Sequence, residues 1–210
     1  MIYWDKTLID DYDIPLKGVI HIGAHVGQEY NDYVDAGIED MLFFEPVKSS
    51  FALLVDALPK SKKIKLFNTA LGNIEGTIEM FISSPNFQGQ SSSILEPNTH
   101  LKSWPKIIFD EKETVKITKL DNIKFEPKLY NIINVDVQGY ELEVLKGAKK
   151  TLPYIDFIFS EINVGEVYTN CAKVFELDNY LRQFGFIRMH TKLYDKVGYG
   201  DAVYVKVLKV

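Results

Sequence analysis

The sequence has very little cysteine, since Cys171 is the one cysteine among 210 residues. A single cysteine forms no internal disulfide and supplies no thiolate cluster that would hold zinc. Long apolar runs are also missing. The longest ones, such as residues 154–159, have the length of buried strands and fall far short of the roughly 20 residues that span a bilayer. We therefore expect no membrane span.

An excess of positive charge is absent too, because the chain has 24 basic and 29 acidic residues and a formal net charge of -5. This balance argues against a large basic surface and disfavours tight electrostatic binding to nucleic acid. Residues 1–16 mix acids with Tyr3, Trp4 and Pro15, and they lack the basic and then apolar layout of a signal peptide. We expect a cytoplasmic protein with a small partner.

The length and the composition predict one folded domain. Hydrophobic residues make up 46% of the chain and charged residues 25%, which is ordinary for a globular protein. A chain of this length buries a full core without a second domain. We assign residues 1–210 to a single domain, in which residues 1–16 form an N-terminal extension. The sequence leaves the oligomeric state open.

Short apolar runs alternate with helix-like stretches, which is typical of a mostly parallel sheet covered by helices on both faces. The expected strands are residues 18–22, 41–44, 64–71, 115–120, 132–135, 155–159, 186–190 and 202–208, and the expected helices are residues 28–36, 49–58, 140–150 and 174–184. Residues 76–82 alternate apolar and polar side chains, so we expect an antiparallel addition to the sheet there. The pattern predicts an α/β fold.

Residues 83–98 are rich in Ser, Asn, Pro, Gln and Gly, which predicts a long loop. Loops of this length in compact domains are functional or mobile, and we interpret this one as a candidate lid. Its hydroxyls, its amides and the ring of Phe87, next to Gln88, suit the binding of a carbohydrate. We select Gln90, Ser91 and Ser92 as candidate substrate-binding residues. The alternative is a disordered surface loop.

The first expected strand runs into a glycine turn and a helix start. Gly23 and Gly27 follow the strand with the spacing G-x-x-x-G, and such a turn lets a nucleotide-like ligand approach backbone N–H groups. The dinucleotide spacing G-x-G-x-x-G is absent, which disfavours a nicotinamide enzyme. Glu45 ends the second strand, where a carboxylate in such folds accepts hydrogen bonds from ribose hydroxyls. The alternative is that the two glycines only make a turn.

Two further acids follow central strands. Asp136 comes after residues 132–135, at the edge where open α/β sheets bind ligands, although it might only cap the next helix. Glu161 and Asn163 follow the next strand. The two acids could share a divalent cation, or one could act as a base while the other orients a substrate. Glu141, in the first turn of the next helix, is interpreted as a partner of the helix dipole.

These segments resemble the FkbM family of S-adenosylmethionine-dependent methyltransferases over about residues 18–206. The segment 135–148, VDVQGYELEVLKGA, preceded by Leu120 and Asp121, is similar to the family's LD…DxEGxExxVLxGA signature. Three other segments look like the family's cofactor-binding segments: residues 23–28, 43–46 and 69–72. The chain departs from the family pattern at Gln138, where Glu is usual, at Asn134, where Lys is common, and at His21, where Asp is common.

The resemblance implies a Rossmann-like class I methyltransferase fold with an antiparallel C-terminal strand and S-adenosyl-L-methionine as cofactor. The cofactor-binding residues it implies, together with those selected above, are Gly23, Ala24, His25, Gly27, Glu45, Pro46, Ala70, Leu71 and Asp136. Gln138 removes a carboxylate from the centre and weakens any metal interpretation, so we expect no metal ion. Gln138 joins the candidate substrate-binding residues.

The resemblance also implies O-methylation, and we expect a sugar hydroxyl of a glycan or glycoconjugate as the acceptor. Methyl transfer from a sulfonium is an in-line displacement that depends mainly on positioning. We assign Asp136 as general base or hydrogen-bond acceptor, with Glu161 and Asn163 orienting the acceptor. The alternatives are a non-sugar acceptor such as a polyketide, a lipid or a carboxylate, and a cofactor-binding module without catalysis.

Overall fold

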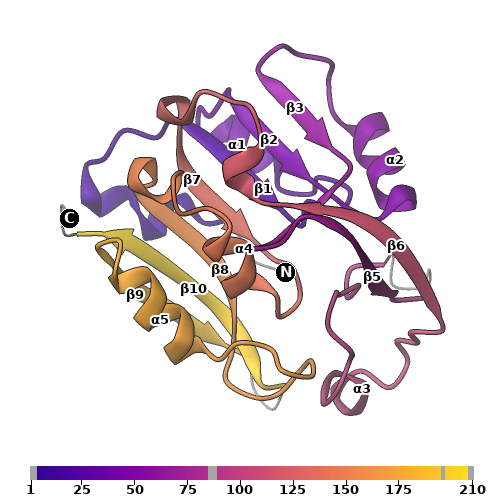
Figure 1. Ribbon diagram of the computed structural model, residues 1–210. Helices are drawn as coiled ribbons and strands as arrows, with labels where there is room; N and C mark the ends of the chain where they lie inside the picture. Colours follow the sequence, from indigo (N-terminus) through magenta and orange to yellow (C-terminus); the bar gives the residue numbers. More distant parts are fainter. Residues whose placement is uncertain (1–3, 85–88, 195–196, 208–210) are drawn as a thin grey trace.

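The computed structural model describes residues 4–84, 89–194 and 197–207, and a seven-stranded central sheet organises them (Figure 1). Its strand order is β3-β2-β1-β7-β8-β10-β9. The strands are β1 (Gly18–Ile22), β2 (Met41–Phe44), β3 (Ile64–Phe67), β7 (Tyr130–Val135), β8 (Phe157–Asn163), β9 (Phe186–Leu193) and β10 (Tyr199–Lys206). The first five strands run parallel, while β10 is antiparallel to β8 and to β9. The predicted mostly parallel sheet with an antiparallel C-terminal strand is confirmed.

Helices cover both faces of this sheet. The α-helices are α1 (Tyr30–Asp35), α2 (Lys48–Ala57), α3 (His100–Ser103), α4 (Glu141–Lys146) and α5 (Val174–Arg182), and the 3-10 helices are Lys6–Leu8, Asp10–Tyr12, Leu120–Asn122, Pro127–Leu129 and Leu152–Tyr154. None of the helices in the described ranges has the length and apolar character needed to cross a membrane.

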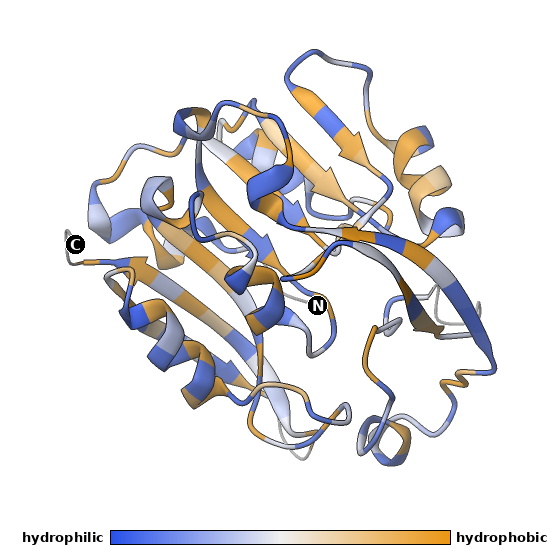
Figure 2. Cartoon of the chain, viewed as in Figure 1, coloured by the Kyte–Doolittle hydropathy of each residue, from blue (hydrophilic) through white to orange (hydrophobic). Residues whose placement is uncertain are grey.

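Side chains that alternate along the strands enter two separate cores, one on each face of the sheet. On β7, Ile133 packs in the core that holds Leu145 of α4 and Leu181 of α5, whereas Ile132 packs in the core that holds Leu54 of α2. The strands are accordingly apolar along most of their length, and polar residues gather on the outer faces of the helices (Figure 2). Burial on both faces is why these strands read as continuous apolar runs in the sequence.

A second sheet corrects two predictions. Residues 64–71, expected as one strand, form β3 and a separate β4 (Ala70–Leu71), because Asn68 turns aside and donates to the carbonyl oxygens of Glu45 and Pro46. β4 pairs with β6 (Glu111–Thr118), which is antiparallel to β5 (Gly76–Ile82) in the order β4-β6-β5. The expected strand 76–82 exists as β5, but it joins this second sheet rather than the central one. β5 and β6 extend away from the central sheet (Figure 1).

Other expected boundaries also shift. The expected strand 155–159 is β8 and continues to Asn163, so Glu161 and Asn163 lie inside the strand rather than after it. The expected helix 140–150 is the short α4, which ends at Lys146 before Gly147. The expected strand 115–120 ends at Thr118, because Leu120 is already part of a 3-10 helix. β8 extends to Asn163 because it pairs with β10 over its whole length.

Candidate functional site

The ends of three parallel strands meet at Gly23. The Gly23 N–H donates to the Phe44 carbonyl oxygen at the end of β2, and the Asp136 N–H donates to the Ile22 carbonyl oxygen of β1, both at 3.0 Å. Gly23 has a φ of +84°, and a Cβ built there would lie 1.8 Å from the Asp136 carbonyl oxygen. Only glycine allows this approach, so Gly23 brings Asp136 to the glycine turn.

Glu45 connects the glycine turn to the segment that follows β2. Its Oε2 accepts the His25 backbone N–H at 2.9 Å, and its Oε1 accepts the Val47 backbone N–H at 2.8 Å. The side chain is almost completely buried. Burial raises the pKa of the Glu45 carboxyl to about 7, although both backbone hydrogen bonds oppose this shift. Each oxygen keeps a further lone pair for a ligand hydroxyl.

A cavity opens beside Glu45 and collects most of the predicted cofactor-binding residues. Its lining includes Gly23, His25, Glu45, Pro46, Ala70, Leu71 and Asp136. Phe44, Met80 and Ile94 add apolar surface. Two predicted residues lie elsewhere: Ala24 is fully buried, and Gly27, at a φ of +80°, packs against Leu54 of α2. A glycine at position 27 is therefore explained by the backbone turn and by the close packing of Gly27 on α2.

A second cavity, of about 240 Å³, adjoins the first. Both cavities are lined by Gly23, His25, Gln90, Asp136 and Gln138. Of the predicted substrate-binding residues, Gln90, Ser91 and Gln138 line this second cavity, whereas Ser92 lines only the first. Glu161 also lines it, but Asn163 lines neither cavity and is fully buried. The position of Asn163 argues against its predicted contact with a substrate.

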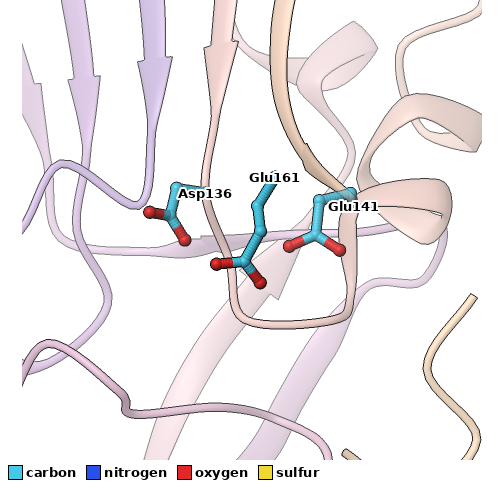
Figure 3. A group of neighbouring side chains, drawn as sticks. All are labelled: Asp136, Glu141 and Glu161. Atoms are coloured by element: carbon cyan, nitrogen blue, oxygen red, sulfur yellow. The ribbon is translucent and has the colours of Figure 1, made fainter. Parts of the chain in front are cut away.

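Gln138 links the two predicted catalytic carboxyls (Figure 3 shows both acids). Its Nε2 donates to Asp136 Oδ1 at 2.7 Å and to Glu161 Oε2 at 3.0 Å. Its Oε1 lies 2.8 Å from the Tyr168 hydroxyl, and its backbone oxygen accepts from Ser93 Oγ at 2.7 Å. An ionised glutamate here would offer only acceptors to these two carboxyls, whereas the amide supplies two donors. Gln138, which departs from the family pattern, therefore holds Asp136 and Glu161 together.

Burial is the main cause that raises the pKa of Glu161 well above its usual range, and the charges of Asp136 and Glu141 raise it further. A raised pKa favours the protonated form of this carboxyl. The two neighbouring acids consequently differ in chemical role. Glu161 is the member that favours donating a hydrogen bond, and Asp136 is the member that accepts one.

Glu141 joins this group, because Asp136, Glu141 and Glu161 each place one carboxyl oxygen within 4.8 Å of the others (Figure 3). Glu141 Oε1 accepts the backbone N–H groups of Val137 at 3.2 Å and of Gly139 at 2.9 Å. The sequence analysis interpreted Glu141 only as a partner of the helix dipole. It missed this second role, in which Glu141 holds the segment between β7 and α4. The expectation of no metal ion stays a prediction.

Glu141 should make the stability of the protein depend on pH. Burial is the largest cause that raises its pKa from 4.5 to about 7, so the folded state favours the protonated carboxyl. This stabilisation is present below the unfolded pKa and is lost as the pH rises through about 7. We expect the free energy of unfolding to fall between about pH 5 and about pH 8, and to fall less in Glu141→Gln. Urea denaturation at both pH values measures this, and an identical pH dependence in the variant would contradict it.

The sequence analysis missed several residues that line the second cavity. Glu29, His100, Trp104 and Tyr199 all contribute to its wall. His21 also lines it and lies opposite Asn134 in the register between β1 and β7, so both departures from the family pattern meet in one place. The sequence analysis had already singled out His21 and Asn134 as departures from the family pattern, and this was the signal that could have marked them as site residues. No pattern pointed to α3 or to the β10 start, because tertiary folding brings them to the cavity.

The segment predicted as a lid is partly packed. Phe87 and Gln88 lie outside the described residues. After them, the Ser93 N–H and carbonyl oxygen exchange hydrogen bonds with Phe81 at 3.0 and 2.8 Å, and the Asn98 N–H donates to the Val167 carbonyl oxygen at 2.9 Å. Ser93 is fully buried. The part from Ser93 onwards is therefore held in place, and the alternative of a disordered surface loop does not describe it.

Comparisons with known proteins agree with this site. Residues 21–188 match the family described as the methyltransferase FkbM domain. The 2-O-methyltransferase NoeI of Sinorhizobium fredii is 29% identical over 170 residues, which cover 78% of this chain and 70% of NoeI. The hexuronic acid methyltransferase AglP of Haloferax volcanii is 33% identical over 85 residues, which cover 40% of this chain and 34% of AglP.

The fold has a solved counterpart in the crystal structure of methyltransferase FkbM from Methylobacillus flagellatus. The two structures superpose with a TM-score of 0.60 at 13% identity over 94% of this chain, which spans 46% of that protein. The predicted class I methyltransferase fold and the predicted family are both confirmed. Because the matched region, residues 21–188, contains the glycine turn, Glu45 and the acids of the second cavity, this chain belongs to the FkbM family of methyltransferases.

Proposed function

We propose that this protein is an S-adenosylmethionine-dependent O-methyltransferase that acts on a hydroxyl group of a sugar in a glycan or glycoconjugate. The observation that carries the proposal is the meeting of two cavities at Asp136. One cavity has a buried carboxylate and an apolar lining, and the other has acids, amides and aromatic side chains. This arrangement suits a methyl donor on one side and a polar acceptor on the other.

The first cavity fits S-adenosylmethionine. Glu45 accepts only one backbone hydrogen bond at each oxygen, so both oxygens remain able to accept from the two ribose hydroxyls. Ala70 and Leu71 of β4 lie in the same lining as Glu45 and offer an apolar surface for an adenine ring. When bound, the cofactor supplies an activated methyl group on a sulfonium.

Asp136 and Glu161 divide the work on the acceptor. A sugar hydroxyl is a weak nucleophile until its proton leaves. Asp136, where the cavities meet, would accept the proton of the acceptor hydroxyl, or a hydrogen bond from that hydroxyl, while the bound cofactor would supply the methyl group to the acceptor oxygen. Glu161, whose raised pKa favours the protonated carboxyl, would orient the acceptor by donating a hydrogen bond. Gln138 holds both carboxyls at 2.7 and 3.0 Å from its amide nitrogen.

The names of the two relatives support an oxygen acceptor on a sugar. NoeI is named as a 2-O-methyltransferase, and AglP is named for methylation of a hexuronic acid. The second cavity supports it as well, since carboxyls, amides and an indole ring are the groups that proteins use to hold a hydroxylated ring. Methylation of a polyketide, a lipid or a carboxylate is the competing outcome of an acceptor screen.

Binding and transfer are tested separately. Calorimetry with S-adenosylhomocysteine and with NAD measures the cofactor preference, and we expect binding of the first ligand only. Transfer of a labelled methyl group to a panel of glycosides then measures activity. Failure to bind S-adenosylhomocysteine overturns the proposal, and binding without transfer to any sugar or non-sugar hydroxyl indicates a module without catalysis.

Glu45→Gln should weaken binding of S-adenosylhomocysteine by roughly 10–100-fold, because a charge-assisted hydrogen bond to the ribose contributes about 1.5–3 kcal/mol. Calorimetry on both proteins gives the two Kd values. The control is Glu39→Gln, which changes an exposed carboxyl paired with Lys63 and should leave the Kd unchanged. A Kd within about twofold of the wild type in Glu45→Gln would remove Glu45 from the cofactor site.

A further inference from the structure

The second cavity has an unbalanced set of ionisable side chains. Its described lining contains the carboxyls of Glu29, Asp136 and Glu161 but no lysine or arginine. Three histidines, His21, His25 and His100, also line the cavity, and burial lowers the pKa of His21 and of His100 to about 4, so these two are neutral at pH 7. An acceptor in this cavity therefore meets three carboxyl groups, and the described lining has no lysine or arginine to pair with a negative charge that the acceptor brings.

Glu29 is the acid in this cavity that no other part of the proposed mechanism uses. It precedes α1, and its side chain is 13% exposed. Its Oε2 lies 4.0 Å from His21 Nε2, while the other ring nitrogen of His21 lies 3.0 Å from the Tyr33 hydroxyl. Because His21 is neutral, Glu29 has no charged partner there. Burial raises the pKa of the Glu29 carboxyl to about 7, so part of it is ionised at neutral pH. Its carboxyl is available to a ligand in the cavity.

The wall near α3 is apolar and aromatic. Trp104 is 44% exposed although it lines the cavity, and Tyr199 lines the same cavity. Ile107 and Val167 complete the same wall. A pyranose ring presents C–H groups on its face and hydroxyls at its edge, so it matches an aromatic wall facing carboxyls.

We infer that the acceptor is an uncharged sugar residue and that Glu29 excludes anionic sugars such as hexuronates. This inference rests on the proposed function and specifies its substrate class. A hexuronate would bring a carboxylate beside Asp136 and the ionised form of Glu29, in a cavity whose described lining has no lysine or arginine to pair with it, and like charges brought together without water repel strongly. The uncharged ring instead donates hydroxyl hydrogens to Asp136 and Glu29 and accepts a hydrogen bond from Glu161. The chain should therefore differ from AglP, which is named for a hexuronic acid.

The test compares matched pairs of acceptors. Methyl glycosides of the gluco, galacto and manno series are each paired with the hexuronate of the same configuration, and labelled methyl transfer gives kcat/KM for both members. We expect the uncharged member to exceed the hexuronate by at least about tenfold in the series that reacts. Glu29→Gln should reduce this ratio by raising kcat/KM for the hexuronate. The matched control, Asp35→Asn, changes an exposed acid of α1, the helix that Glu29 precedes, and should leave the ratio unchanged.

S-adenosylhomocysteine binding by each protein distinguishes the possible failures. A wild type that does not bind it refutes the proposed function. A wild type that binds it but methylates hexuronates at least as well as the uncharged sugars overturns the inference alone. One that binds it but methylates neither overturns the sugar acceptor of the proposed function together with the inference. An unchanged ratio in a Glu29→Gln protein that binds S-adenosylhomocysteine with normal affinity also overturns the role of Glu29.

Discussion

Asp136→Asn should lower kcat by about 10²–10⁴-fold, the usual contribution of a general base. The asparagine keeps an oxygen that can accept the Gln138 amide, which donates to Asp136 Oδ1 at 2.7 Å in the wild type. The local geometry should survive while the capacity to take a proton is lost. Steady-state kinetics with a reactive acceptor measures the change, and calorimetry should find a Kd for S-adenosylhomocysteine within about threefold of the wild type.

Glu161→Gln is the informative comparison for this variant. Because its raised pKa favours the protonated carboxyl, Glu161 acts as a hydrogen-bond donor, and the glutamine side chain also supplies a donor. We therefore expect a smaller loss of kcat than in Asp136→Asn. Equal losses in both variants would mean that the two acids act as one unit, and unchanged turnover in Asp136→Asn would refute its assignment as the base.

Gly23→Ala should destabilise the protein and remove cofactor binding together. The new Cβ would lie 1.8 Å from the Asp136 carbonyl oxygen, so β1 and β7 must separate where the cavities meet. The backbone conformation, with φ at +84°, adds strain of about 1–3 kcal/mol. We expect a fall in Tm of roughly 10 °C, since 1 kcal/mol corresponds to about 2–4 °C in a chain of this size.

Gly37→Ala is the matched control because it isolates the strain from the clash. Gly37 has a φ of +79°, and a Cβ built there meets nothing within 4 Å. We expect a loss of about 1 kcal/mol and normal binding of S-adenosylhomocysteine. Thermal denaturation and calorimetry on both variants give the comparison. If the two variants lose equal stability, the close approach of Gly23 to Asp136 does not determine the site.

Local patterns predicted the frame of the site correctly because local chemistry determines it. The apolar runs of β1, β2 and β7 reflect burial on both faces of the sheet, and Gly23 marks a turn whose conformation few other residues adopt. Glu45 and Asp136 come directly after parallel strands, so their shared edge follows from topology. Such features need no knowledge of distant parts of the chain.

Long-range contacts decided the remaining features. The break between β3 and β4 depends on hydrogen bonds from Asn68 to residues more than 20 positions away, and no local pattern encodes such partners. The continuation of β8 through Glu161 depends on β10, whose Asp201 pairs with it in register. Glu161 was therefore found as an acid, but its burial inside a strand, and with it the raised pKa, was not predicted.

The amino-acid sequence alone determined the α/β class, the family, the glycine turn and the two acids that end parallel strands. Only the tertiary structure decided which side chains complete the second cavity, because Glu29, Trp104 and Tyr199 come from three distant segments. Strand ends are set by short-range burial and backbone conformation. The charge and shape of a cavity instead depend on how all the elements pack around it.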